Sequence, residues 1–366
     1  MRHWTLPRHL AILLVAAAVM LGVTAGLDPF RDYQLATAAA YLCAAAGLTM
    51  LAGQNGQLSL GHGALMAIGG YTVAMVQNKF GAHNVLTQWA LLASLAAGVC
   101  VAAVAGAVIG VAAARLRGPY LAGLTLVVAV AVPSIGSLWN GLFHGDQGLS
   151  VYLVPAPAAL GESFPLERWQ AWLALIAALV TMLVLGNLTS GQFGRTLRAV
   201  RDDEIAARLG GINVAKVQVI AFVVSAACAG LGGGMLAVLA QSVSPGAFAF
   251  TLSLNLLLAV VVGGLGSLTG AVWGSILLVL LPWLADTATS SLIHSPAAQQ
   301  RLAGNLPLAV FGLLLVVVMI AAPGGIQGLL NRAARWVRGR RDGRGAHRAE
   351  PSAPDAEPHA PVASRT

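Results

Sequence analysis

The sequence predicts an all-α, polytopic integral membrane protein with about ten transmembrane helices, some of them short or broken. Three observations predict this fold class. Hydrophobic residues make up 57% of the chain, and the mean hydropathy is +0.78. Apolar runs of roughly 20 residues, enough to cross a bilayer core, recur along most of the chain. A soluble domain is excluded because segments such as 217–240 leave no face for polar residues.

The expected helices follow from these apolar runs, taken in order. The first run follows a basic head, as in a signal peptide, but further spans follow and no small-residue cleavage site does, so we expect a retained helix. The eighth run is short. The ten expected segments are 10–27, 34–52, 58–77, 89–114, 119–139, 169–187, 217–240, 252–264, 266–285 and 305–322.

The distribution of Lys and Arg predicts the orientation of these helices, because positively charged loops stay in the cytoplasm. With a cytoplasmic N-terminus and ten alternating helices, only Arg31, Lys79, Arg168 and Arg301 of the 21 basic residues fall outside. We therefore expect a multi-pass protein of the bacterial cytoplasmic membrane with both termini in the cytoplasm. The net charge of +8 is then a consequence of topology, and no nucleic-acid partner is expected, because the basic residues are divided among loops.

The expected domain organisation is a transmembrane domain at 1–330, with a cytoplasmic loop at 188–216, and a tail at 331–366. The tail is Arg-rich and then rich in Ala and Pro, so we expect it to be disordered, with its arginines near the anionic headgroups of the lipid bilayer.

Catalytic, metal and cofactor sites are not expected. Cys43, Cys100 and Cys228 all fall in apolar runs, and "GGLGSLTG" lacks the GK[ST] ending of a phosphate-binding loop. No Lys, Arg, Asp or Glu lies in 33–78 or 217–285. Proton-driven carriers usually keep such an acid inside the membrane. The energy for transport is therefore expected from outside the chain.

The charged stretch "GRTLRAVRDDEIAARLGGINV" predicts a short docking helix in the cytoplasmic loop. Asp202 is expected to cap it, and Gly210 and Gly211 to end it. Ile205 and Leu209 would share one face and form a small apolar knob ringed by charge. The alternative is an ordinary solvated loop that is positive because it is cytoplasmic.

The stretch "GQNGQLSLGHGALMAIGG" predicts a broken helix, because four glycines at 53–63 weaken helix continuity. Broken helices at membrane depth are tolerated where they line a cavity or are enclosed by protein. Segment 54–72 is therefore the leading candidate for the translocation path, with neutral polar groups from Gln57, Ser59, His62 and Tyr71. The alternative is that the glycines allow close helix packing and that His62 is a satisfied interior histidine.

Five stretches resemble LivM-type permeases, the membrane subunits of branched-chain amino acid ABC importers. They are the charged stretch with the helix after it, "GQLSLGHGALMAIGGYTVA", "RLRGPYLAGLTL", "VVGGLGSLTGAVWGSILLVLLP" and "APGGIQGLL". Together they cover 53–330 in family order. Gly210 departs from the family, which usually has a larger apolar residue there, and so does "FHGDQGL" at 143–149, where the family often has a Thr-Gly-Gly run.

The resemblance implies that 195–213 is the coupling helix that inserts into a cytoplasmic ATPase subunit. It also implies a second, LivH-like permease subunit, two ATPase subunits, which carry out the ATP hydrolysis, and an extracytoplasmic binding protein. The cargo would be branched-chain amino acids or a related small polar solute. The residues that match the family's coupling positions are Arg195, Arg198, Arg201, Asp203, Glu204, Ala207, Gly211 and Asn213.

Two other classes of function remain open at this point. One is an ion-coupled secondary carrier that works alone, and the other is a passive channel for urea, amides or similar neutral solutes.

Overall fold

The computed structural model describes residues 28–82, 87–116, 119–157, 160–161, 164–292 and 324–332, together with a few isolated positions. The expected first helix at 10–27, the tenth at 305–322 and the tail from 333 lie outside these continuous ranges.

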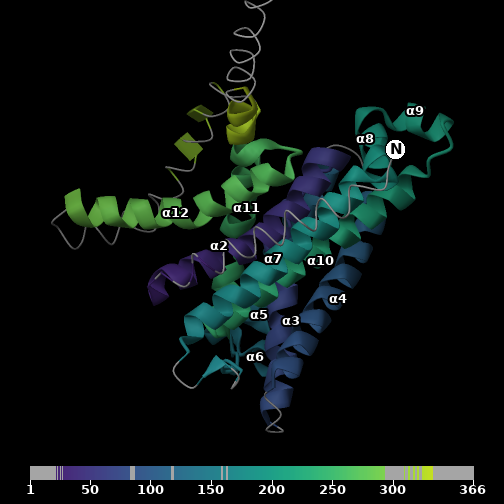
Figure 1. Ribbon diagram of the computed structural model, residues 1–366. Coiled ribbons are helices and arrows are strands. Elements are labelled where there is room, and N and C mark those ends of the chain that lie inside the picture. The colour runs from purple at the N-terminus through teal and green to yellow at the C-terminus, as the bar shows by residue number, and fades with distance from the viewer. Residues whose placement is uncertain are drawn as a thin grey trace, which may run out of the picture.

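Helices dominate the described residues, as the sequence predicts, and two short strands pair with each other (Figure 1). The elements are α2 (Pro29–Leu48), the π-helix η1 (Thr49–Gln54), α3 (His62–Ala82), α4 (Gln88–Ala113), α5 (Pro119–Leu138), α6 (Asn140–Phe143), the 3-10 helix η2 (Gly145–Gln147), β1 (Leu149–Ser150), α7 (Leu166–Ser190), α8 (Gln192–Asp202), α9 (Glu204–Leu209), α10 (Val214–Ala240), β2 (Ser242–Val243), the 3-10 helix η4 (Pro245–Phe248), α11 (Phe250–Gly264) and α12 (Leu268–Leu292).

The expected apolar segments between 34 and 285 coincide with helices whose ends differ by a few residues. Six stretches of the described chain are long and apolar enough to cross a membrane: Pro29–Gln54, Gln88–Ala113, Tyr120–Leu138, Leu166–Ser190, Val214–Ala240 and Pro245–Gly264. A shorter apolar helix, Leu268–Leu284, follows them. The polytopic helical fold is thereby confirmed for this part of the chain.

Close packing of α10 against its neighbours explains several of the glycines. A Cβ at Gly230 would stand 3.0 Å from the carbonyl oxygen of Gly98 on α4 and would also meet the Cβ of Ala102. On the other side, a Cβ at Gly69 of α3 would collide with the backbone of Gly230. Small residues thus let α3, α4 and α10 approach backbone to backbone, as the glycine spacing predicts.

The helix ends form two groups, which we call the α8 end and the β1 end after the element that each contains (Figure 1). The α8 end holds α8 and α9, the residues between η1 and α3, the turn between α11 and α12, and the segment 324–332. At the β1 end, β1 pairs antiparallel with β2, and the Nε2 of Gln77 donates to the carbonyl oxygen of Tyr152 at 3.2 Å.

An ion pair belongs to the β1 end as well. Asp32, near the start of α2, is buried, and its Oδ2 lies 3.5 Å from the Nε of Arg168, near the start of α7. The grouping of helix ends agrees with the alternation of spans expected from the sequence. Which end faces the cytoplasm stays a prediction.

Candidate functional site

The predicted coupling loop contains two helices, α8 and α9, where the charge pattern predicts one. The helix expected to start at Asp202 corresponds to α9, and α8, which begins ten residues earlier at Gln192, was not expected. Leu197 and Val200 of α8 are buried, while Arg195 and Arg201 are exposed. The physical reason is an amphipathic pattern: Phe193, Leu197 and Val200 stand at i, i+4 and i+7 and give α8 one apolar face.

The second helix, α9, is capped by Asp203, so the expected cap at Asp202 is wrong by one residue. The Oδ1 of Asp203 accepts hydrogen bonds from the backbone N–H groups of Ile205 and Ala206, at 2.8 and 3.0 Å. Asp202 instead ends α8. Gly211, at φ +80°, ends α9 as predicted, because this left-handed conformation favours glycine.

The apolar knob predicted on α9 is present and points away from the rest of the chain. The side chains of Ile205 and Leu209 are 70% and 86% exposed, while Ala207 is buried beneath them. The carboxylate of Glu204 lies 3.7 Å from the guanidinium of Arg208, one turn apart. An exposed apolar tip with charges beside it suits a groove on a partner protein.

The remaining predicted coupling residues differ in what they contact. Asn213 caps α10, because its Oδ1 accepts from the N–H of Lys216 at 3.0 Å. Arg198 reaches the carbonyl oxygen of Thr189, 3.4 Å from its Nη1. Arg195 is exposed. The eight residues therefore lie together in α8, α9 and the turn before α10, but Ala207 is buried and several others hold this loop together rather than face outward.

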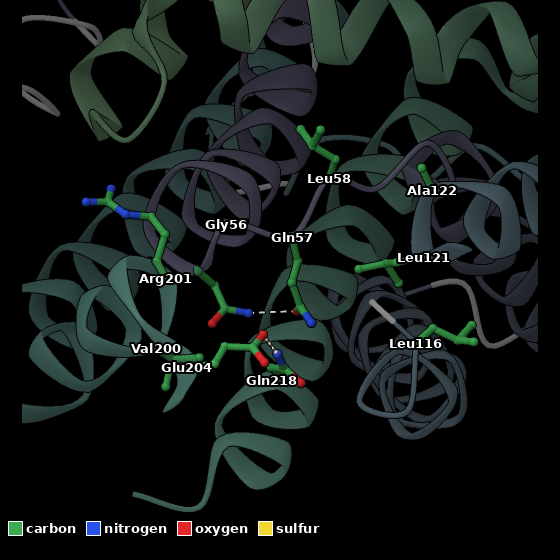
Figure 2. Close-up of a pocket in the computed structure, with 11 residues that line it drawn as sticks. Gly56, Gln57, Leu58, Leu116, Leu121, Ala122, Val200, Arg201, Glu204 and Gln218 are labelled. Atoms are coloured by element: carbon green, nitrogen blue, oxygen red, sulfur yellow. Dashed lines mark hydrogen bonds between the residues drawn. The ribbon is translucent and has the colours of Figure 1, made fainter. Parts of the chain in front are cut away.

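Arg201 reaches from α8 to η1, at the end of the second span. Its Nη1 donates to the carbonyl oxygen of Gly53 at 2.8 Å, and its Nε and Nη2 donate to the Oδ1 of Asp202 at 3.0 and 2.8 Å. Figure 2 shows Arg201 beside Gly56, with its guanidinium directed away from the neighbouring pocket.

The chain is non-helical at 56–61, and we call this segment the break. It connects the expected span 34–52 to the expected span 58–77 at the α8 end, so the predicted interruption is present but lies between two spans rather than inside one. The π-helix η1 continues α2 as far as Gln54, and α3 begins at His62, after the break. Gly56 has φ +74°, a conformation that favours glycine. The N–H of Leu60 donates to the Oγ1 of Thr125 on α5 at 3.0 Å, so a side chain supplies the partner that a helix would have given.

The four predicted path residues lie in three different surroundings. Gln57 is buried and its Oε1 accepts from the Nδ2 of Asn55 at 2.7 Å. His62 is fully buried, with its Nδ1 3.2 Å from the Oγ of Ser59 and its Nε2 2.8 Å from the Oγ of Ser225 on α10. These contacts favour the alternative stated above for His62, that of a satisfied interior histidine.

Tyr71 lies apart from the other three and contacts the ring of Phe143 edge to face, with the ring centroids 5.0 Å apart. Both rings line a largely apolar pocket of about 340 Å³ formed by residues of α3, α4, α5 and α6. The structure therefore does not bring Tyr71 together with Gln57.

A second pocket of about 340 Å³ joins the break to α8, α9, α5 and α10 (Figure 2). Its polar wall contains Asn55, Gln57, Glu204 and Gln218, and the Nε2 of Gln218 donates to the Oε1 of Glu204 at 3.0 Å. Sequence reasoning missed Gln218 and included Asn55 only as part of segment 54–72. The available signal was an amide side chain inside or beside an apolar segment. The other lining residues are Gly56, Leu58, Leu116, Leu121, Ala122, Val200 and Arg201.

Within the described ranges, no cluster of three His, Cys, Asp or Glu side chains is arranged to hold a metal ion.

Comparison with known proteins gives one family and several relatives. Residues 31–323 match the family described as "Branched-chain amino acid transport system / permease component". The chain is 29% identical to the high-affinity branched-chain amino acid transport system permease protein LivM of Salmonella typhimurium, over 87% of this chain and 73% of that protein. It is 30% identical to LivM of Escherichia coli, over 78% of this chain and 67% of that protein. It is 26% identical to the high-affinity branched-chain amino acid transport system permease protein LivH of Escherichia coli, over 79% of this chain and 91% of that protein. No solved structure matches the chain.

Proposed function

Because the chain belongs to the family of permease components of branched-chain amino acid ABC transport systems, we propose that it carries branched-chain amino acids across the bacterial cytoplasmic membrane. The chain is a membrane-spanning permease component, and ATP hydrolysis resides on separate subunits of the transport complex. Its direct partners, its orientation and its cargo are parts of the proposal.

The single observation that carries the proposed mechanism is the exposed tip of α9. Ile205 and Leu209 are exposed on a short helix whose base is held by Asp203 and by α8. Exposed apolar side chains that gather in a patch mark a contact with a partner protein or a membrane, and the charged residues around this tip favour a protein groove. We assign this tip to the cleft of an ATPase subunit, which places the α8 end in the cytoplasm.

The similarity to both LivM and LivH supports a second permease subunit related to this one. Two related subunits would present two such tips, one to each of two ATPase subunits. An extracytoplasmic binding protein would then deliver the cargo at the β1 end.

An external source of work agrees with the lack of charges in 33–78 and 217–285. A ligand shifts a two-state gate only by its differential affinity for the two states. ATP-driven closure of the ATPase subunits supplies the remaining work through α8 and α9.

The test is to co-express the chain with the second permease, the ATPase subunits and the binding protein of its own gene neighbourhood. Leu209→Asp places a charge at the tip and should remove the ATPase subunits from the purified complex. Leu209→Met keeps the tip apolar and should retain them. If Leu209→Asp still co-purifies with the ATPase subunits and still imports leucine, α9 is not the coupling helix.

The same preparation separates the two other classes of function. Uptake by this chain alone, driven by an ion gradient in liposomes, would identify a secondary carrier. Flux of urea or amides without ATP, unchanged by Leu209→Asp, would identify a channel.

A further inference from the structure

The end of the second span leaves a carbonyl oxygen that the helix itself cannot satisfy. Gly53 lies in the last turn of η1, and the final four carbonyl groups of a helix have no intrahelical donor. Short π-helical segments of this kind often occur at functional sites. The donor that reaches the Gly53 oxygen is the Nη1 of Arg201, from a helix 148 positions further along the chain.

Contacts on both sides of Gly53 make this hydrogen bond part of a rigid connection. A Cβ at Gly53 would collide with the backbone N of Gly266, so the end of η1 lies directly against the turn between α11 and α12. A Cβ at Gly56 would stand 2.9 Å from the Cγ of Arg201, so the side chain of Arg201 also presses on the start of the break. A displacement of α8 must therefore move the break as well, or lose both contacts.

The orientation of the guanidinium is fixed by α8 itself. Two of its nitrogens bind the Oδ1 of Asp202, which leaves Nη1 for Gly53. The planar fork of arginine makes these contacts together, whereas the ammonium of lysine is a single point charge.

We propose that Arg201 is a positioning residue that transmits the movement of α8 to the end of the second span and to the break that follows it, and that it does not bind the ATPase subunit directly. This inference rests on the proposed function, because it assumes that α8 and α9 receive the movement of an ATPase. The resemblance placed Arg201 among the ATPase-coupling positions. The hydrogen bond to Gly53 assigns Arg201 instead to the contact between α8 and the end of η1.

The first experiment compares Arg201→Gln, Arg201→Lys and the control Arg115→Gln in the complete complex in liposomes. Arg115 is an exposed basic residue, and it lines a groove with Asn213 and Lys216 at the α8 end. Arg201→Gln should retain the ATPase subunits and their basal ATP hydrolysis. Leucine import, and the stimulation of ATP hydrolysis by loaded binding protein, should fall by roughly 5- to 150-fold, the usual range for coupling between two sites. Arg201→Lys should lie between Arg201→Gln and wild type, and Arg115→Gln should match wild type.

The second experiment does not depend on the cargo. Hydrogen exchange at the amides of 53–61 is measured with and without a non-hydrolysable ATP analogue. The analogue should change the exchange rate in the wild-type complex and in Arg115→Gln, but not in Arg201→Gln. This change reports movement of the break, which a merely stabilising role of Arg201 would leave in place.

Two results would overturn the inference. If Arg201→Gln loses the ATPase subunits, Arg201 is a docking residue. If its import and its exchange response equal those of wild type, the hydrogen bond transmits nothing. If Arg201→Gln does not fold, the same measurements of import and hydrogen exchange on Arg201→Lys test the inference. A wild-type complex that does not import leucine, but does show the exchange response, would instead refute the proposed cargo.

Discussion

Removal of the α9 cap by Asp203→Ala tests whether the exposed tip depends on one side chain. Asp203 accepts two hydrogen bonds, from the N–H groups of Ile205 and Ala206, in a helix of six residues. Loss of such a cap costs about 1 kcal/mol, within a range of about 0.5–2 kcal/mol. Because 1.4 kcal/mol corresponds to a tenfold change in an equilibrium constant, the folded-to-open ratio of α9 should fall about fivefold.

The measurement is hydrogen exchange at the amides of residues 205–209 in the purified complex without nucleotide. Exchange should accelerate about fivefold in Asp203→Ala, since opening precedes exchange. Asp203→Asn is the control, because asparagine caps as well as aspartate and gives up only the charge interaction with the helix dipole. Equal exchange in Asp203→Ala and wild type would refute the capping argument, and so would equal exchange in the two variants.

Two further predictions concern the packing of α10. Gly230→Ala should lower the melting temperature of the detergent-solubilised protein by an overpacking cost of about 1–3 kcal/mol, because its Cβ would meet α4. Gly186→Ala, where no described heavy atom lies within 4 Å of the new Cβ, should leave the melting temperature unchanged or raise it. Equal melting temperatures for the two variants would contradict the close contact between Gly230 and α4. His62→Ala should lower stability by about 1–3 kcal/mol, because the Oγ of Ser225 loses its partner. The double variant with Ser225→Ala should lose less than the sum of the single losses in a thermal shift assay, and full additivity would show that the pair does not interact.

The spans could be predicted because a bilayer requires long apolar runs, and the chain supplies them with few interruptions. Segment 217–240 was predicted within three residues of the start of α10 and at its end. The break after η1 was also predictable, because Gly53, Gly56 and Gly61 are concentrated there. The charged loop also carries the spacing of a helix in Phe193, Leu197 and Val200, but the charges of α8 obscure it.

Contacts between distant residues could not be predicted in the same way. Asp202 and Asp203 are equivalent cap candidates by sequence, and the choice depends on the pairing of Asp202 with Arg201. The guanidinium of Arg201 is in turn shared between Asp202 and the carbonyl oxygen of Gly53, which lies 148 positions away along the chain. Such arrangements follow from the folded chain as a whole, and they decide which charged residues face a partner.

The two-residue ladder between β1 and β2 has a mechanical consequence. It fastens the loop before α7 to the loop after α10, and Leu149 and Val243 are buried where they pair. If movement enters at the α8 end while the β1 end is held, the helices tilt about the β1 end. The β1 end would then stay nearly fixed. The displacement caused by such a tilt would increase along α10 and be greatest next to α8.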